Sequence, residues 1–211
     1  MSREFWVFIG LIVPTMAGLF AIAVRDTAAP RGERLERPKR LPVPANARKA
    51  TFAGGCFWGV EETFRKAPGV VDTRVGFTGG TSPNPTYESV HQDRTGHVEA
   101  VEVTFDPTKT SYERLVLLLF TAHDTTRPGI RDSAMGRQYR SFIFTHDAAQ
   151  ASIAQQTLRT LSKSGKYQGA PRPIATAIRP ATIFQPAEEY HQRYYEKRGM
   201  ASSCALEPPT R

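Results

Sequence analysis

Residues 50–67 say most about the fold of this chain. A short apolar stretch is followed there by two glycines and then by apolar residues at helical spacing. Ala50–Ala53 is typical of a short strand that stops at Gly54-Gly55. Cys56–Ala67 then has apolar residues at helical spacing, and Pro68-Gly69 ends the pattern. The segment predicts a strand joined to a helix through a pair of glycines.

The same alternation continues to residue 198. We expect further strands at 70–77, 97–105, 139–145 and 173–178. We expect helices at 110–122, opened by a Thr110-x-x-Glu113 capping box, at 147–163, with Asp147 as N-cap, and at 187–198. Residues 81–85 contain two prolines and are predicted to form a loop. Alternating strands and helices predict an α/β or α+β sandwich, with helices packed on a sheet.

The N-terminus carries an apolar segment that is separate from this pattern. Phe5–Val24 has 20 residues without a charge, about the length that crosses ~30 Å of hydrocarbon. Ala21-Ile22-Ala23 is typical of a signal-peptide cleavage site, whereas the length, the nearly neutral start and Arg25 favour an uncleaved anchor. We favour a transmembrane anchor over residues 1–25, with a cleaved signal peptide as the alternative.

Three further regions follow the anchor. We expect a Pro/Arg-rich linker at 26–48, the folded domain at 49–204 and a flexible tail at 205–211. By the positive-inside rule, the arginines after the anchor would hold the domain on the cytoplasmic side of the inner or plasma membrane. Export favours the periplasmic side, or release if the leader is cleaved, so the sequence leaves the membrane face open.

Charge and cysteine content exclude several classes of function. The chain has 211 residues, enough for one substantial core, and a net charge of +8. Residues 1–49 contribute +5 of this charge and residues 50–211 only +3, which argues against a nucleic-acid groove on the domain. Two cysteines without a CxxC pair make neither a disulfide scaffold nor a structural zinc site.

Cys56 lies where the first strand ends and the first helix begins. A helix N-terminus has unpaired N–H groups and a partial positive charge, which favour a thiolate. The preceding glycines permit backbone geometries that a Cβ forbids, and they let a ligand approach closely. The alternative is a buried small hydrophobic residue, which a lone cysteine often is.

The two aromatic residues after Cys56 cannot both face the core from one helix. Phe57 has the better spacing with Val60 and Phe64, so we expect Phe57 in the core. Trp58 then lies beside the cysteine, where its flat apolar face can hold a small apolar or sulfur-bearing group. The alternative is that both rings simply pack.

The predicted strand at 97–105 has an acidic side chain on each face. Glu99 shares its face with Val101 and Val103, whereas Glu102 lies on the opposite face. Desolvation on the more apolar face would raise the pKa of Glu99 and keep it protonated near neutral pH. A neutral carboxyl is a proton donor, unless Glu99 occupies a solvated strand end.

Two tyrosines lie at the edges of predicted elements. Tyr87 follows the proline-containing loop, and Tyr139 begins a predicted strand. Phenol groups at such edges most often pack at interfaces, but they also donate hydrogen bonds well to an oxyanion.

Five motifs resemble those of the A-type peptide methionine sulfoxide reductases. They are GGCFWG at 54–59, GFTGG at 76–80, NPTYESV at 84–90, GHVEAVEVTFDP at 96–107 and QYRS at 138–141. The similarity runs in order from about Lys49 to about Cys204, and GGCFWG with GHVEAV is highly specific. It implies this family's ferredoxin-like fold, with a mixed sheet covered by helices. It also implies an oxidoreductase that reduces the S-epimer of methionine sulfoxide, free or in proteins, without a metal or organic cofactor.

By position, the resemblance implies a role for each candidate residue. Cys56 would attack the sulfoxide sulfur and end as a sulfenic acid, while Phe57-Trp58 would hold the S-methyl group. Glu99 would give a proton to the sulfoxide oxygen, to which Tyr87 and Tyr139 would hydrogen-bond. Sulfoxide oxygen leaves poorly until it is protonated, so the reaction needs a thiolate and an acid together.

Cys204 is the only other cysteine, and it follows the serines of a C-terminal tail, as resolving cysteines do in similar proteins. A sulfenic acid condenses with a second thiol to a disulfide, which a dithiol protein can reopen. The resemblance therefore implies a Cys56–Cys204 disulfide, with thioredoxin or a similar dithiol protein as reductant. The alternative is a tail thiol that takes no part.

One loop departs from the family pattern. Before QYRS the family typically has an Asp that helps to organise the active site, and Ala134 stands in its place, with Ile130 where an Arg is expected. Asp132 lies two residues earlier and is a candidate replacement. Our hypothesis is that this loop is rearranged and that activity or substrate preference is altered.

Two rival functions stay open from the sequence. A degenerate relative would bind oxidised methionine segments without turnover, which the loop around Ala134 motivates. A Cys–His hydrolase would pair Cys56 with His97 or His191 and form an acyl-enzyme.

Overall fold

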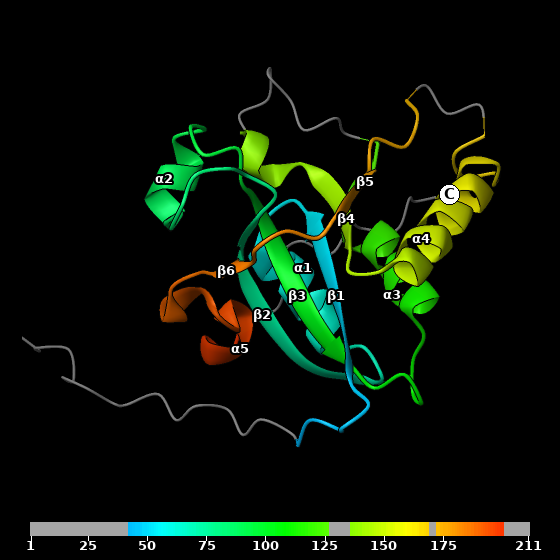
Figure 1. Ribbon diagram of the computed structural model, residues 1–211, viewed down its shortest axis with the longest axis horizontal. Coiled ribbons are helices and arrows are strands. Elements are labelled where there is room, and N and C mark those ends of the chain that lie inside the picture. The colour runs from blue at the N-terminus through cyan, green and yellow to red at the C-terminus, as the bar shows by residue number, and fades with distance from the viewer. Residues whose placement is uncertain (1–41, 127–135, 169–171, 201–211) are drawn as a thin grey trace, which may run out of the picture. The chain divides into compact units, whose positions relative to one another are not determined.

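The computed structural model describes residues 42–126, 136–168 and 172–200 of the chain (Figure 1). None of the helices within these residues is long and apolar enough to cross a membrane. The anchor predicted for residues 1–25 lies outside the described residues, as do most of the predicted linker and the whole predicted tail.

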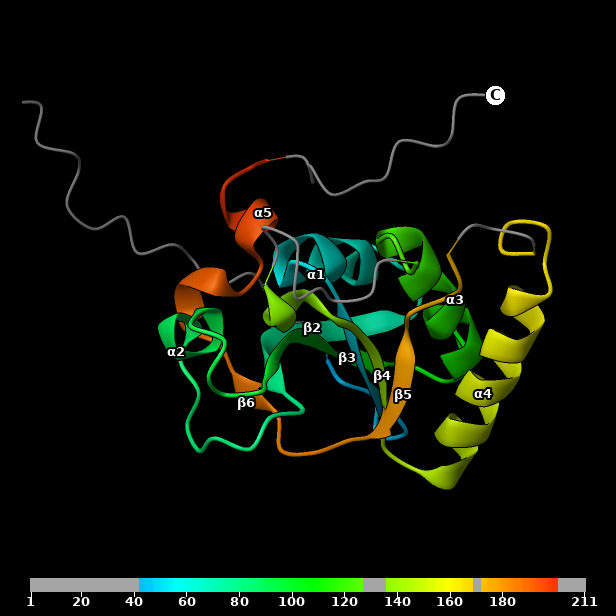
Figure 2. The same cartoon turned by 90° about the horizontal axis from the view of Figure 1, so that it is seen from above.

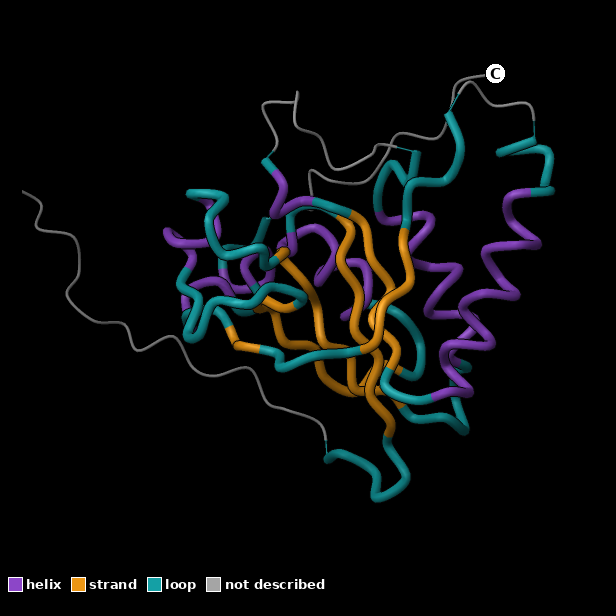
Figure 3. Tube along the Cα trace, turned by 45° about the horizontal axis from the view of Figure 1, so that its top comes forward, coloured by secondary structure: helices purple, strands orange, loops and turns teal. Residues whose placement is uncertain are grey.

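A six-stranded sheet forms the centre of the domain, in the order β5-β4-β1-β3-β2-β6 (Figures 1 and 3). The strands are β1 (Arg48–Gly54), β2 (Val70–Thr78), β3 (Val98–Phe105), β4 (Ser141–Thr145), β5 (Ala177–Pro180) and β6 (Gln185–Pro186). Strands β1 to β4 pair antiparallel and β5 pairs parallel with β4, so the sheet is mixed, as predicted. The order 4-1-3-2 of the first four strands, with a helix after β1 and after β3, is that of a ferredoxin-like unit.

Helices cover one face of this sheet (Figure 2). The longer ones are α1 (Phe57–Arg65), α3 (Tyr112–Ala122) and α4 (Ala148–Ser162), of which α4 packs against α3 and β4. Short elements complete the domain: α2 (Tyr87–His91), η1 (Arg137–Tyr139), η2 (Glu189–His191) and α5 (Tyr194–Lys197).

The core lies between the sheet and the helices, and its centre is aromatic. Phe52 of β1 stacks on Phe64 of α1, with the ring centroids 4.9 Å apart. The opposite face of the sheet carries a smaller apolar cluster of Ala53, Val98, Ala100, Phe142 and Phe144. The segment between β5 and β6 crosses that second face and packs Ala181 and Phe184 on it (Figure 2). Both faces of the central strands are therefore buried.

Local patterns set the helix starts. Asp147 is the N-cap of α4, as predicted, and its Oδ1 accepts a hydrogen bond from the Gln150 N–H at 2.7 Å. The capping box predicted at Thr110 is wrong, because Ser111 is the N-cap of α3 and its Oγ accepts from the Arg114 N–H. A serine one residue closer to the helix satisfies the free N–H groups directly.

The continuous helix predicted at 187–198 is wrong. The chain forms η2 and α5 instead, separated by Arg193 in a left-handed conformation with a φ of 52°. The side-chain amide of Gln192 bonds both the N–H and the C=O of Val75 in β2, and the Arg193 N–H donates to Glu61 Oε2. Hydrogen bonds to the rest of the domain replace those of a regular helix.

The starts of β4 and β5 lie later than predicted. Arg137–Tyr139 forms the turn η1, so β4 begins at Ser141 and Tyr139 precedes the strand. The last predicted strand, 173–178, begins at Ala177, where β5 pairs with Phe142 of β4.

Candidate active site

The two glycines before Cys56 shape the start of α1. Gly55 has a φ of 89°, which glycine adopts without strain, and a Cβ on Gly54 would lie 2.8 Å from His123 Nδ1. Cys56 is the N-cap, and its carbonyl accepts the hydrogen bond of the Val60 N–H. The half-buried Cys56 therefore lies at the N-terminus of the helix, as the sequence predicted.

Glu99 reaches the same helix start from β3. Its Oε2 accepts a hydrogen bond from the backbone N–H of Phe57, the residue after Cys56, at 2.9 Å. The side chain is 1% exposed, and burial raises the pKa of Glu99 to about 8, although the Phe57 hydrogen bond acts in the opposite direction. Glu99 is therefore a neutral acid at pH 7, and the alternative of a solvated strand end is wrong.

Tyr87 and Tyr139 approach Cys56 and Glu99 from two short elements. Tyr87 is the first residue of α2 and Tyr139 is the last residue of η1. Burial raises the pKa of both phenols, and the neighbouring Glu99 and Cys56 raise it further. Both hydroxyls keep their hydrogen at neutral pH and can donate it.

Phe57 lies in the core, as the sequence predicted, and Trp58 packs against the edge of the same core. Phe57 is buried in the main core, whereas Trp58 is partly buried, with the two ring centroids 6.3 Å apart. The indole of Trp58 stacks on Tyr194 at 3.7 Å, and its Nε1–H donates to His191 Nδ1 at 3.1 Å. The Tyr87 ring packs on the other ring of this pair, with its centroid 4.4 Å from that of His191. The rings give the site an apolar wall beside Cys56.

The two histidines proposed as partners of Cys56 in a hydrolase have other roles. His97 Nδ1 accepts from the Gly80 N–H at 3.3 Å, and its Nε2–H donates to the Ser82 carbonyl at 2.9 Å. The Nδ1 of His191 accepts a hydrogen bond from Trp58 Nε1–H. A neutral imidazole has only one acceptor nitrogen, and both rings already use theirs. The hydrolase alternative is therefore not supported.

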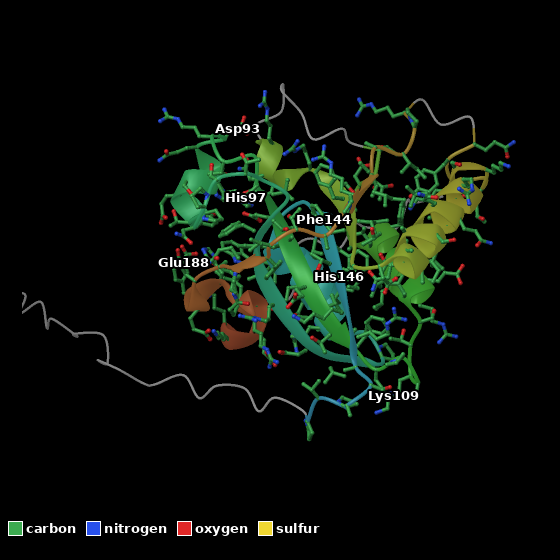
Figure 4. The ribbon with its side chains drawn as sticks, in the orientation of Figure 1. Asp93, His97, Lys109, Phe144, His146 and Glu188 are labelled. Carbon is green, nitrogen blue, oxygen red and sulfur yellow. The ribbon has the colours of Figure 1, made fainter. Side chains whose placement is uncertain are left out.

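The segment after β6 is held against α2 and β2. Glu188 Oε1 accepts from the Tyr87 N–H at 3.3 Å, and Gln192 bonds Val75. Figure 4 shows His97 and Glu188 on the side of the domain where α2 lies, and Lys109 at the opposite end of the sheet. These contacts place His191 beside Trp58.

Sequence reasoning missed His91, the last residue of α2. Its Nε2 lies 3.1 Å from the Tyr139 hydroxyl oxygen and 3.5 Å from Glu99 Oε1. The sequence does contain a signal for α2, because Thr86 and Ser89 form a reciprocal capping box at its start. A helix there would have placed His91 one turn after Tyr87, on the same side.

Several sequence predictions concern residues outside those described. Cys204 lies there, and so do Ile130, Asp132 and Ala134 of the loop that departs from the family pattern. Within residues 42–126, 136–168 and 172–200, no group of three or more His, Cys, Asp or Glu side chains is arranged to hold a metal ion.

Comparison with known proteins gives this site a context. The model of a family described as peptide methionine sulfoxide reductase matches residues 48–210. The chain belongs to this family.

Relatives within the peptide methionine sulfoxide reductases match most of the chain. MsrA of Methanoculleus marisnigri is 52% identical over 151 residues, which cover 72% of this chain and 90% of the relative. The structure of methionine sulfoxide reductase A of Corynebacterium diphtheriae has a TM-score of 0.67 and 34% identity, covering 80% of this chain and 82% of its own. Mxr1 of Saccharomyces cerevisiae in complex with Trx2 has a TM-score of 0.50 and 25% identity, covering 74% and 91%.

We predict that Glu99→Gln changes how stability depends on pH. The amide keeps an acceptor for the Phe57 N–H but carries no charge. Burial raises the pKa of Glu99 from 4.5 to about 8 in the folded protein, so the unfolded chain ionises first as the pH rises. The wild type should therefore lose stability relative to the variant between pH 4.5 and about 8, with no further change above.

Urea unfolding of both proteins at about pH 5, 7 and 9 measures this difference in the free energy of unfolding. Glu61, a second buried carboxyl whose pKa burial raises, is present in both proteins, so its titration cancels. A difference that is the same at all three pH values would contradict the protonation state assigned to Glu99.

Proposed function

We propose that this protein reduces the S-epimer of methionine sulfoxide, free or in proteins, with a dithiol reductant, and so repairs oxidised proteins. The observation that carries the proposal is the meeting of Cys56 with a buried, neutral Glu99 at the start of α1. A thiol nucleophile and a proton donor are the two groups that this reduction needs. The family and the relatives named above support the same activity.

In the first step Cys56 Sγ attacks the sulfoxide sulfur, and Glu99 gives its proton to the oxygen. The protonated oxygen then passes from the substrate sulfur to Sγ, as the sulfur–oxygen bond and the transient bond between the two sulfurs both break. Methionine leaves reduced by two electrons, and Cys56 becomes a sulfenic acid, oxidised by two electrons. The Phe57 N–H occupies Glu99 Oε2, so the proton to be transferred resides on Oε1. Water can supply that proton again after methionine leaves.

The rings around Cys56 bind the substrate in this proposal. Phe57 and Trp58 hold the S-methyl group, since an apolar wall favours a methyl and a thioether over water. Tyr87 and Tyr139 keep their hydrogens at neutral pH, so each phenol is able to donate to the oxygen as negative charge develops on it.

The second step restores the thiol. The Cys204 thiol attacks the Cys56 sulfenic acid, a disulfide forms and water leaves. A dithiol protein then reduces the disulfide and is itself oxidised. The structure of the relative Mxr1 in complex with Trx2 supports thioredoxin in this role.

We predict epimer-selective turnover with dithiothreitol as reductant. The protein should convert the S-epimer of methionine sulfoxide to methionine and leave the R-epimer unchanged. Cys56→Ser should lower kcat/KM about 10³-fold or more, because a hydroxyl cannot take the place of the thiolate. Methionine release by chromatography measures both. Binding of the S-epimer without turnover would support a degenerate relative instead, and an acyl-Cys56 formed with esters would support a hydrolase.

We predict that Cys204→Ala stops the cycle after one turnover when thioredoxin is the donor. The variant should still form about one methionine per protein without added reductant, because the first step needs only Cys56. Rapid-quench counting of methionine, with thiol titration of the product, measures this. Continued turnover with thioredoxin would show that Cys204 is not the resolving cysteine.

We also propose that residues 1–25 tether the domain to the inner or plasma membrane, on the length and the flanks of the apolar run Phe5–Val24. Single cysteines placed in residues 30–45 should stay with the membrane fraction. An impermeant thiol reagent on intact cells should label them only if the domain is periplasmic. Recovery of these residues without residues 1–25 would contradict the anchor and indicate a cleaved signal peptide.

A further inference from the structure

The ring of His91 is fixed by its own helix. Its Nδ1 lies 2.9 Å from the backbone carbonyl of Tyr87, one turn earlier. A carbonyl oxygen only accepts hydrogen bonds, so Nδ1 carries a hydrogen and donates it. The ring also stacks on the Tyr87 ring, with the centroids 3.9 Å apart. These two contacts fix both the orientation of the ring and the side on which Nδ1 lies.

The other nitrogen of His91 faces the site. A neutral imidazole has one N–H, and Nδ1 carries it, so Nε2 presents a lone pair. The Tyr139 hydroxyl oxygen lies 3.1 Å from Nε2, and Glu99 Oε1 lies 3.5 Å away. Only the Tyr139 distance is within the ordinary range of a hydrogen bond. The Tyr139 O–H therefore donates to His91 while the ring is neutral.

This bond has a consequence for the substrate, because a tyrosine has a single hydroxyl hydrogen. While Tyr139 donates it to His91, Tyr139 presents only lone pairs to a sulfoxide oxygen. When His91 gains a proton, Nε2–H becomes a donor and the Tyr139 oxygen accepts from it. The hydrogen of Tyr139 is then released towards the substrate.

We propose that His91 is a positioning residue that sets the direction of the Tyr139 hydrogen: a neutral ring holds it, and a charged ring releases it to the sulfoxide oxygen. The proposal rests on the function proposed above, in which Tyr139 binds that oxygen. It adds a residue that acts only through Tyr139.

The charge of His91 depends on its neighbours and on solvent. The groups that face it are Glu99 from β3, Tyr139 from η1, Tyr87 and Glu88 on its own helix, and His191 from η2. Its side chain is 25% exposed, against 1% for Glu99.

The test measures how much Tyr139 contributes to binding with and without His91. All proteins carry Cys56→Ser, so that the S-epimer of methionine sulfoxide binds without reacting, and titration calorimetry at about pH 8 gives Kd. With His91 present, Tyr139→Phe should weaken binding less than about twofold, because the hydrogen is already held by His91. With His91→Phe, the same change should weaken binding about threefold to tenfold, the effect of one lost hydrogen bond.

The variants separate this role from a structural one. His91→Phe keeps a ring to stack on Tyr87 and removes only the nitrogens, and His91→Leu serves as a second variant. His146→Phe is the matched control, because His146 Nε2 also bonds a hydroxyl, that of Thr51 at 2.9 Å, in a contact that involves neither Tyr139 nor Glu99. In this control the factor for Tyr139→Phe should stay below about twofold, as in the parent protein.

Two results would overturn the proposal. An equal cost of Tyr139→Phe with and without His91 would show that the bond to His91 does not withhold the Tyr139 hydrogen from the substrate. The same small factor in the parent protein at a pH at which nitrogen-15 NMR shows the His91 ring charged would show that a charged His91 does not release Tyr139. Failure of the parent protein to bind the S-epimer at either pH would instead contradict the proposed function on which this inference rests.

Discussion

The hydrogen bond from the Phe57 N–H to Glu99 Oε2, 2.9 Å long, is the contact on which the rest of the site depends. It uses one of the N–H groups that a helix start leaves unpaired, and it fixes an acid of β3 beside the residue that caps α1. A hydrogen bond of this kind favours a carboxylate, but the burial of Glu99 outweighs it and raises the pKa to about 8. One peptide group thus holds a neutral acid next to a cysteine at a helix N-terminus.

The remaining groups reach this point from segments far apart in the sequence. Tyr87 is the first residue of α2, and Tyr139 is the last residue of η1. His191 follows β6 and accepts a hydrogen bond from Trp58 Nε1–H. None of these short elements has the length to be stable alone. Hydrogen bonds between segments hold them, such as that from the Tyr87 N–H to Glu188, and the site is therefore a product of the whole domain.

The sequence predicts the parts of this site whose signals are local. The glycines and the apolar spacing place Cys56 at the start of α1, and the period of a strand places Glu99 on the core face. It does not predict His91, because five residues of α2 are too few to show a helical period. Nor does it predict the break at Arg193, which bonds to distant residues impose on a pattern that is helical by itself. The family resemblance identified the chemistry, which residue patterns alone had left open.

The proposed chemistry depends on the protonation state of Glu99, which carbon-13 NMR of the glutamate carboxyls measures. Within the part of the chain that the structure describes, Glu61 is the other carboxyl whose pKa burial raises, to about 7, so Glu61→Gln and Glu99→Gln assign the two signals. We expect a signal that is lost in Glu99→Gln, stays neutral at pH 7 and titrates near pH 8. A Glu99 signal already ionised at about pH 6 would contradict it, because the cysteine would then have no proton donor beside it.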